Sequence, residues 1–392
     1  MPLYKERAKE LIQKAGVDAV LATSAANIYY ISDYDSISMK LSPGLQSYAL
    51  LPLDNDPALI APLSEVDLVV ESGSWIKDIH YFGSLNVNVS KNPKGSEVTN
   101  RIIDASKKEA GDTPCDVLAM VVTQRGLARM KIAIDLNQLS PLRWETIRKN
   151  LPDVKFVNGT ELLNDLKAVK TPEEINRIQH ATEITEKSME DALEIAQPNI
   201  MELDLSGMFN YSVAEDGGKV TYDFIGFGER SAYPNPLPSS LQAQKGDLIR
   251  LTLGTTWNHY NGNVARTAVL GKASSEIEKR LAVIVDAQES AFDMIKPGAK
   301  ISDVYAAAEK ELLKGGVKQC ANLLGHGIGI ECNEYPWITK GMEYEIKGGM
   351  VLNIDIPYLD LGWGGIEMED TVLVTKKGVK LMTNTERTIY LL

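Results

Sequence analysis

Cysteine is scarce in this 392-residue sequence, which has only Cys115, Cys320 and Cys332. Their odd number and wide spacing argue against a disulfide framework and favour a reducing compartment, so we expect a cytoplasmic protein. No two of them have the spacing of paired metal ligands. The sequence also lacks an apolar run of about 18 residues and an apolar N-terminal signal core, so we expect no membrane partner.

Basic residues are outnumbered, with 41 Lys and Arg against 53 Asp and Glu and a net charge of −12. This acidic balance argues against a nucleic-acid partner and favours a self-repelling surface. The hydrophobic fraction of 44% and the charged fraction of 24% are ordinary for a globular protein. The chain is long enough to form two domains.

Strands and helices alternate through the first part of the sequence. Apolar residues at helical spacing predict a helix over 3–15, and short apolar runs predict strands over 17–22, 48–53 and 58–61. Such alternation is typical of an α/β fold. We therefore predict an N-terminal α/β domain over residues 1–158.

The remainder of the sequence has longer elements. Thr171, Pro172 and Glu174 have the pattern of a capping box, which predicts the start of a long helix. These elements predict helices packed on a largely antiparallel sheet, which makes residues 159–392 a second domain and the whole chain α+β. Further helices are predicted over 275–297 and 302–314, and strands over 219–227, 247–254, 259–270, 350–358 and 366–375.

Only four histidines occur, and His326 lies in a run with three glycines, Gly325-His326-Gly327-Ile328-Gly329. Glycine has no Cβ, so backbone can approach such a histidine closely. Asp355 and Glu369 follow in strand-like segments. One histidine and two carboxylates that folding brings together make either a metal site or an acid–base site, and the residues alone leave both open.

Seven short motifs, taken together with their order and spacing, resemble the pita-bread family, which includes methionine aminopeptidase, Xaa-Pro aminopeptidase, prolidase and creatinase. Residues 160–385 resemble its catalytic domain, and the preceding residues resemble the N-terminal domain of the prolidase and creatinase branch. The resemblance implies a C-terminal pita-bread domain with an N-terminal creatinase-like α/β domain. The motifs are Lys170-Thr171-Pro172-Glu173-Glu174, Lys245-Gly246-Asp247-Leu248, Ala265-Arg266-Thr267, Gly325-His326-Gly327-Ile328-Gly329, Glu334-Tyr335-Pro336, Gly348-Gly349-Met350-Val351 and Glu369-Asp370-Thr371-Val372-Leu373-Val374-Thr375.

The metallopeptidases of that family hold two metal ions with two aspartates, one histidine and two glutamates. The matching positions here are Thr252, Asn263, His326, Asp355 and Glu369. Two anionic ligands are thus replaced by neutral side chains, and two adjacent divalent ions need several anionic ligands to offset their repulsion. The resemblance therefore implies a degenerate two-metal site.

Two chemistries remain open for the three residues that are kept. His326, Asp355 and Glu369 could hold one divalent ion, manganese, cobalt or zinc, with a place left for water. Without metal, Asp355 or Glu369 would activate water and His326 would give a proton to the leaving nitrogen. Creatinase is the family precedent for hydrolysis of a C–N bond without metal. We expect the second arrangement, with no cofactor.

Two departures from the family bear on the substrate. Family members place a histidine where this sequence has Asn235, so Asn235 is expected at the pocket. They place another histidine where this sequence has Asn333. Glu334, the residue after Asn333, is therefore expected near the leaving group. Many members carry an arginine at the position of Glu367, where it can pair with a substrate carboxylate. A glutamate would suit a cationic substrate group, and the alternative is that Glu367 points to solvent.

Three more residues lie in segments that border the pocket in the family. His259 is a candidate second acid–base group, or an exposed or packed histidine. Tyr260 offers an aromatic face to a substrate, or fills the core. Arg266 contacts the substrate, or pairs with a buried carboxylate. Together with Asn235, Thr252, Asn263 and Glu367, they complete the candidate substrate-binding residues.

The sequence therefore predicts a hydrolase of a C–N bond (amide, peptide or amidino) in a small molecule or dipeptide. One alternative is a Xaa-Pro dipeptidase or aminopeptidase that uses a single divalent metal. Another is a non-catalytic domain that binds a peptide or small molecule. The resemblance also implies a homodimer, because family members with this N-terminal domain commonly form one.

Overall fold

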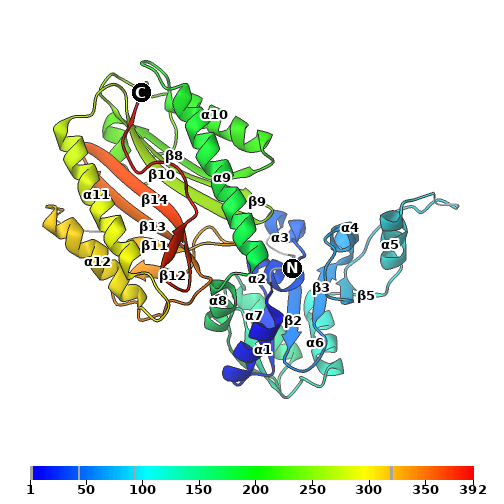
Figure 1. Ribbon diagram of the computed structural model, residues 1–392. Helices are drawn as coiled ribbons and strands as arrows, with labels where there is room; N and C mark the ends of the chain where they lie inside the picture. The colour runs from blue at the N-terminus through cyan, green and yellow to red at the C-terminus, as the bar shows by residue number, and fades with distance from the viewer. Residues whose placement is uncertain (1–2, 43–44, 92–93, 318–320) are drawn as a thin grey trace. The chain divides into compact units, whose positions relative to one another are not determined.

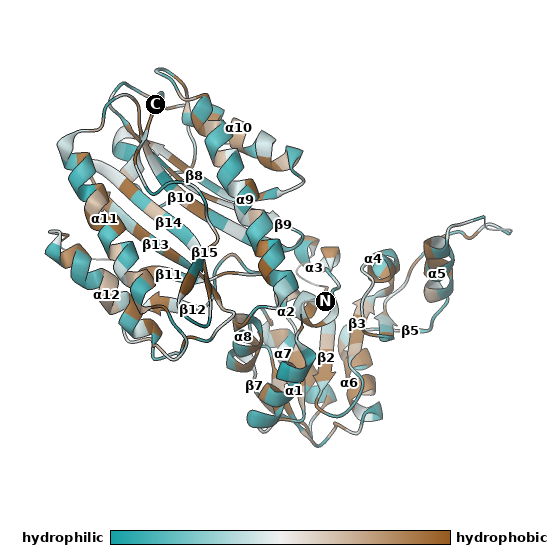
Figure 2. Ribbon diagram, viewed as in Figure 1, coloured by the Kyte–Doolittle hydropathy of each residue, from teal (hydrophilic) through white to brown (hydrophobic). Residues whose placement is uncertain are grey.

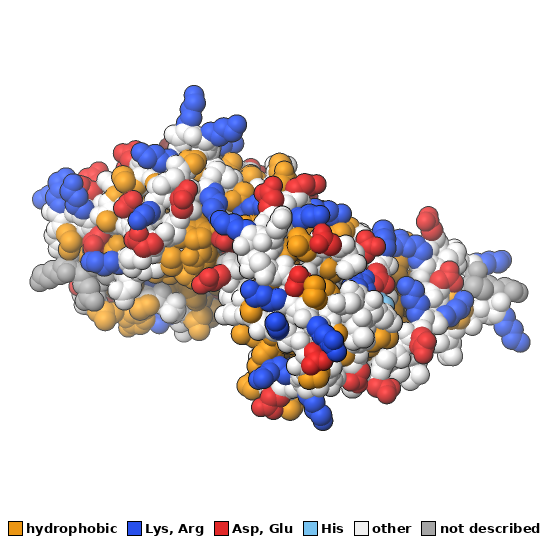
Figure 3. Space-filling model, turned by 90° about the horizontal axis from the view of Figure 1, so that it is seen from below, with side chains coloured by type: hydrophobic (Ala, Val, Ile, Leu, Met, Phe, Trp, Pro, Cys, Tyr) orange, Lys and Arg blue, Asp and Glu red, His pale blue; other side chains and the backbone are white. Residues whose placement is uncertain are grey.

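The computed structural model describes residues 3–42, 45–91, 94–317 and 321–392. Cys320 lies outside these described residues. The described chain forms two compact units, residues 1–167 and 168–392 (Figure 1). No helix in the described ranges is long and apolar enough to cross a membrane. On the face shown in Figure 3, acidic and basic side chains are interspersed, as the acidic but mixed composition predicts.

The first unit is an α/β domain built on a seven-stranded sheet of order β5-β4-β3-β2-β1-β6-β7 in its described part. Its strands β1, β6 and β7 are parallel, and β2 joins β1 and β3 in antiparallel fashion. Helix α6 packs its apolar side on this sheet. The strands are β1 Ala19–Ala22, β2 Tyr48–Pro52, β3 Ala58–Pro62, β4 Asp78–Phe82, β5 Ala110–Gly111, β6 Lys131–Ile134 and β7 Lys155–Asn158. The helices are α1 Lys5–Lys14, α2 Ala25–Ser32, α3 Ile37–Leu41, η1 Leu63–Glu65, α4 Val66–Glu71, α5 Glu97–Ser106, α6 Pro114–Gln124, α7 Pro141–Asn150 and α8 Thr160–Ala168.

Helix α8 places the boundary between the units later than we predicted. The Leu166 carbonyl accepts hydrogen bonds from the Arg7 guanidinium at 3.2 Å and from the Tyr30 hydroxyl at 2.7 Å. These bonds hold α8 to the first unit, so the chain divides after Lys167 and not after residue 158. Contacts between residues so far apart in the chain leave no local pattern in a sequence.

The second unit is a nine-stranded, largely antiparallel sheet covered by helices, and it confirms the predicted fold class. The main path of its described strands is β12-β11-β13-β14-β10-β9-β8, with β15 paired to β14 and β16 to β10. The strands are β8 Lys219–Phe227, β9 Leu248–Trp257, β10 Tyr260–Val269, β11 Leu323–Gly327, β12 Glu334–Thr339, β13 Val351–Asp360, β14 Gly364–Val374, β15 Val379–Leu381 and β16 Tyr390–Leu391. The helices are α9 Pro172–Glu194, α10 Glu202–Glu215, η2 Gly228–Ala232, α11 Ser275–Met294 and α12 Ile301–Lys314.

The two faces of this sheet differ in chemistry because side chains alternate along a strand. Ile354 and Ile356 of β13, with Met368 and Val372 of β14, join one apolar core with residues of α11 and α12. Helix α9 covers the same face over β10 (Figure 1), and hydrophobic and hydrophilic segments alternate along α9 and α11 (Figure 2). In β13 and β14, the residues between those of the apolar core lie on the opposite face, which we call the site face. Its polar side chains are Asn353 and Asp355 of β13 and Glu367, Glu369 and Thr371 of β14.

The predicted capping box at the start of α9 is confirmed. Thr171 accepts a hydrogen bond from the Glu174 backbone N–H at 3.3 Å, and the Glu174 carboxylate accepts one from the Thr171 N–H at 2.7 Å. The close approach of α9 to β10 depends on Gly262, because a Cβ there would lie 2.3 Å from the Thr182 nitrogen of the helix. The helix backbone thus fixes one face of β10 and leaves the other for the site.

We predict that Gly262→Ala destabilises the second unit by about 2 kcal/mol or more, because the added methyl group must push backbone away from backbone. Gly207→Ala is the matched control, since Gly207 lies in α10 and a Cβ there meets nothing within 4 Å. That control should stabilise by about 0.5–1 kcal/mol through helix propensity. Urea unfolding followed by circular dichroism measures both, and equal effects of the two substitutions would contradict the packing argument.

Candidate functional site

His326 lies in β11, between β12 and β13, and not in a loop. A Cβ on Gly325 would lie 2.0 Å from the Asn353 carbonyl oxygen, and one on Gly327 would lie 2.7 Å from the Tyr335 carbonyl oxygen. The glycines therefore allow β11 to fit tightly between its neighbours. The His326 ring is buried, with 6% of the residue exposed, and its Nδ1 lies 2.9 Å from the Gly327 carbonyl oxygen. A carbonyl oxygen only accepts, so Nδ1 carries the proton and Nε2 keeps its lone pair.

The strand register brings the predicted carboxylates together on the site face. Asp355 is paired with Glu369, Glu369 with Ala265, and Ala265 with Thr252, so these four side chains form one row across β13, β14, β10 and β9. Residues paired in this way have side chains on the same face. His326 is paired with Asn353, two residues before Asp355, and therefore lies in the adjacent row.

A chain of hydrogen bonds orients Glu369 beside the histidine. Glu369 Oε1 accepts a hydrogen bond from Asn353 Nδ2 at 2.8 Å, and Asn353 Oδ1 accepts one from Thr371 Oγ1 at 2.7 Å. His326 Nε2 lies 3.9 Å from Glu369 Oε1, too far for a direct hydrogen bond. His326 Nε2 and the Glu369 carboxyl group therefore face one another without a direct hydrogen bond.

Glu367 lies on the same face, and only 4% of the residue is exposed. It forms an ion pair with Arg250 of β9 and accepts a hydrogen bond from Thr252 Oγ1 at 2.5 Å. The alternative in which Glu367 points to solvent is therefore wrong. Its carboxylate is already neutralised within the chain, which removes the ground for reserving it for a cationic substrate group.

Asn263 completes the site face on β10 and is fully buried. Its Nδ2 lies 3.3 Å from Cys332 Sγ, and burial raises the pKa of the Cys332 thiol to about 11. The ring of Tyr222 packs on the neighbouring Gly254, where a Cβ would lie 2.4 Å from the ring carbon Cε1. Thr252 and Asn263 thus contribute an alcohol and an amide to a closely packed polar surface.

Burial sets the protonation of the three central groups. Desolvation, and next the charge of Glu367, raise the pKa of Glu369 to about 8. Desolvation raises the pKa of Asp355 well above its usual value, and the charges of Glu367 and Glu369 raise it further. Desolvation lowers the pKa of His326. At neutral pH the site thus favours a neutral histidine beside protonated carboxyl groups.

Comparisons with known proteins agree with this architecture. The sequence profile described as Metallopeptidase family M24 matches residues 176–376, and the profile described as Creatinase/Prolidase N-terminal domain matches residues 5–169. The chain belongs to metallopeptidase family M24. It is 34% identical over 248 residues to a Xaa-Pro dipeptidase of Pyrococcus furiosus, a match that covers 61% of this chain and 69% of the relative.

Two further relatives match over nearly the whole chain. A Xaa-Pro dipeptidase of Pyrococcus horikoshii is 27% identical, with 99% of each chain covered. The crystal structure of the prolidase from Pyrococcus horikoshii OT3 superposes with a TM-score of 0.79 at 26% identity, over 98% of this chain and 99% of that one. These findings confirm the pita-bread, prolidase-like resemblance and place the chain among enzymes that hydrolyse C–N bonds.

The family implies a metal, and a centre of two divalent ions needs several anionic donor atoms. Two positions of the five-ligand set are Thr252 and Asn263, whose side chains are neutral and hydrogen-bonded to Glu367 and Cys332. Within the described residues, no group of three or more His, Cys, Asp or Glu side chains has the geometry to hold an ion. Two of the five positions thus carry neutral donor atoms in place of carboxylates.

Glu334, predicted to act near the leaving group, begins β12 and is paired with Gly327, the residue after His326. Its carboxylate and the Lys170 ammonium form an ion pair at 2.5 Å, with 2% of each side chain exposed. The Glu331 backbone N–H donates to the same carboxylate at 3.1 Å. A Cβ on Gly329 would lie 2.7 Å from that carboxylate, so the glycine makes room for it. These contacts hold the Glu334 carboxylate in place beside His326, and its action near the leaving group stays a prediction.

Three of the predicted substrate-binding residues lie outside the cluster. Arg266 is on the helix-covered face, where its ion pair with Asp370 has an N–O distance of 2.6 Å, so the structural alternative holds. Tyr260 is buried and donates to Glu174 at 3.1 Å. His259 is exposed at positive φ in the turn between β9 and β10. Since a strand rises about 3.3 Å per residue, that turn lies more than about 15 Å from Thr252.

Asn235 is exposed in the segment after η2, so the structure does not bring it into the buried cluster. Conversely, the cluster contains Arg250, Tyr222, Asn353 and Cys332, which we did not predict. Arg250 could have been found from the period-two pattern of β9, because it shares a face with Thr252 and Gly254. The other three required the register of strands distant in sequence.

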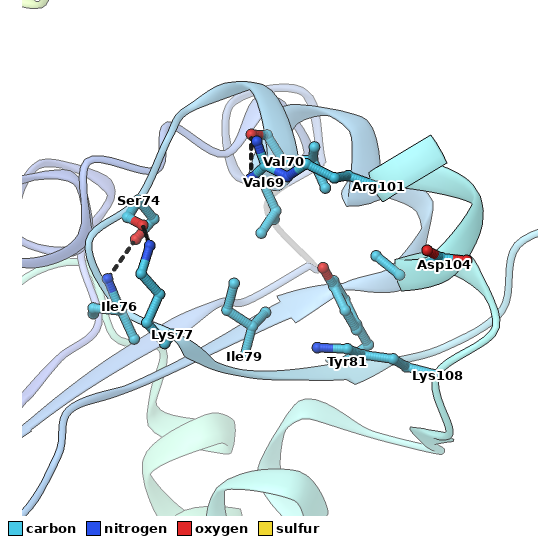
Figure 4. A pocket seen from close by; sticks show the side chains of 11 residues that line it. Val69, Val70, Ser74, Ile76, Lys77, Ile79, Tyr81, Arg101, Asp104 and Lys108 are labelled. Carbon is cyan, nitrogen blue, oxygen red and sulfur yellow. Dashed lines mark hydrogen bonds between the residues drawn. The ribbon is translucent and has the colours of Figure 1, made fainter. Parts of the chain in front are cut away.

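The first unit has a cavity of about 310 Å³ between α4, β4 and α5 (Figure 4). Its lining is mostly apolar around Tyr81, with Lys77, Arg101 and Lys108 at the edge and Asp104 as the one carboxyl group among the described lining residues. It has no histidine and no pair of carboxyl groups for acid–base work. The site face of the second unit is therefore the better candidate for catalysis.

We predict that Glu369→Gln weakens the pH dependence of stability. The pKa of Glu369 is raised in the folded state, so its contribution is full below the unfolded value near 4.5 and is lost as pH rises through about 8. Wild-type stability should therefore fall between those limits, and the Gln variant should lose part of that slope. Urea unfolding at pH 5–8.5 measures this, with the exposed Glu278→Gln as control. An unchanged slope in Glu369→Gln would contradict the raised pKa.

Proposed function

We propose that this M24 chain hydrolyses a C–N bond of a small, dipeptide-sized substrate by proton transfer, without the two-metal centre of the family. The proposal is based on His326 and Glu369, which face one another in the site. Thr252 and Asn263 lie at positions where the family has anionic ligands. The dipeptidase relatives support the class of substrate. The hydrogen bonding of His326 supports acid–base chemistry.

The geometry supports roles opposite to those expected from sequence. Because His326 Nδ1–H donates to Gly327, its free Nε2 is placed to accept a proton from water. The water oxygen then forms a bond to the carbon of the scissile C–N bond. Glu369 or Asp355, each protonated through its raised pKa, gives a proton to the leaving nitrogen as that bond breaks. The histidine returns its proton to the ionised carboxyl group, which restores the starting state.

Two buried oxygens mark where a substrate or water would bind. Asp355 Oδ1 and Glu369 Oε2 have no hydrogen-bond partner among the described residues. A buried polar atom without a partner is costly, so these oxygens favour a bound group that donates hydrogen bonds. An amide or amino group of a small substrate has this character.

The same two oxygens favour a second candidate function, a Xaa-Pro dipeptidase with one divalent ion. His326 Nε2, Asp355 and Glu369 would then hold manganese, cobalt or zinc, which would polarise the substrate carbonyl group. The names of the Pyrococcus relatives support the substrate of this alternative. It differs from the first proposal in requiring about one ion per chain for turnover.

We predict that His326→Gln lowers kcat/KM by about 10²–10⁴-fold, because it removes the proton acceptor and keeps the size of the side chain approximately. The assay uses a panel of Xaa-Pro dipeptides, simple amides and guanidino compounds. His180→Gln is the control, since His180 lies on α9 with 47% of its side chain exposed. Unchanged turnover of every accepted substrate in His326→Gln would refute the proposed role.

The choice between the two functions is made on the wild-type enzyme. After dialysis against a chelator, we predict less than about 0.1 divalent ion per chain and full turnover. Elemental analysis and the activity assay are run on the same sample. Loss of turnover on dialysis, with recovery on addition of manganese, cobalt or zinc, would establish the single-metal dipeptidase and contradict the metal-free proposal.

We also propose that the chain forms a homodimer, on the resemblance to relatives with the same N-terminal domain. Light scattering coupled to gel filtration should give twice the chain mass of 43.1 kDa. A single-chain mass across the micromolar range would contradict this proposal.

A further inference from the structure

Arg250 is an unusual residue for its place in the sheet. In β9, Ile249, Leu251 and Leu253 face the helices and are fully buried, whereas Arg250 points to the site face with 1% exposed. Burying a guanidinium group is costly unless it is paired. An apolar residue would satisfy packing there without this cost, so the charge itself calls for an explanation.

Arg266, a second buried arginine of the sheet, makes more hydrogen bonds than Arg250. The Arg266 guanidinium donates to Asp370 and to four backbone carbonyl oxygens, those of Ala265, Glu369, Thr385 and Glu386. Arg250 donates only to Glu367 and the Tyr233 carbonyl oxygen, and its Nε has no partner among the described residues. Arg250 therefore makes fewer hydrogen bonds than Arg266, and the side chain that it contacts, Glu367, belongs to the carboxyl cluster.

The guanidinium also acts on the groups that would bind an ion. Arg250 and Thr252 both donate to Glu367 Oε2. Glu367 thereby joins the guanidinium of Arg250 to Thr252, which is one of the five positions where the family has metal ligands. A divalent ion between Asp355 and Glu369 would be repelled by the charge of this guanidinium, and more strongly because the site is buried.

We infer that Arg250 supplies from within the chain the positive charge that offsets the buried carboxyl cluster, and that it thereby excludes a divalent ion. Arg250 is a positioning residue that holds Glu367 within the cluster. This inference rests on the proposed metal-free function. It goes further by naming the residue that keeps the site free of metal, in addition to the two missing carboxylates.

The test restores the missing carboxylates with and without the charge at position 250. The double variant Thr252→Asp, Asn263→Asp is made in three backgrounds: with Arg250, with Arg250→Lys and with Arg250→Met. Calorimetric titration with Mn²⁺ alone measures affinity and stoichiometry. We expect the Met background to bind Mn²⁺ at least about 100-fold more tightly than the Arg and Lys backgrounds, which retain the charge. Arg230→Met in the double variant is the control, because Arg230 pairs with Glu202 outside the cluster.

Equal Mn²⁺ affinity in the Arg, Lys and Met backgrounds would overturn the inference while leaving the metal-free function intact. Binding of Mn²⁺ by the wild-type chain, with turnover that depends on it, would instead remove the proposed function. Circular dichroism checks that each variant is folded. If the Met background unfolds, Glu367→Gln is added to remove the carboxylate left unpaired, and the same comparison is made with Arg250 and Glu367→Gln together.

Discussion

The placement of three carboxyl groups, two of them buried, on one face of an antiparallel sheet is the constraint on which this site depends. Asp355, Glu367 and Glu369 lie on neighbouring strands, and each charge would be costly to bury alone. Metallopeptidases of the family meet this demand with two ions. Here Arg250 pairs with Glu367, and burial raises the pKa of Asp355 and of Glu369, which is the basis for the proposal that these two groups hold protons.

The same arrangement links stability to chemistry. Because the guanidinium of Arg250 offsets the charge of Glu367, a divalent ion would meet less net negative charge at this cluster. Protons held by Asp355 and Glu369 are available for transfer, and the neutral His326 beside them has a free Nε2. The protons that would neutralise Asp355 and Glu369 are therefore the same protons that could be transferred when a C–N bond is cleaved.

Local patterns in the sequence predicted the two-domain fold, the capping box at Thr171 and the grouping of His326, Asp355 and Glu369. The face of each strand followed from alternation, as in β13 and β14. The partners did not: the pairing of Glu367 with Arg250 and of Glu334 with Lys170 joins strands and turns more than 100 residues apart. Which polar residue a buried carboxylate meets depends on register and packing, and a linear pattern does not contain these.

If protons and Arg250, rather than metal ions, neutralise the cluster, crystals grown with excess Mn²⁺ should bind no manganese there. Anomalous diffraction at the manganese edge should then show no peak among His326, Asp355 and Glu369. A group or water should instead be hydrogen-bonded to Asp355 Oδ1 and Glu369 Oε2. An anomalous peak with ligand distances of about 2.0–2.3 Å to those three side chains would contradict this expectation.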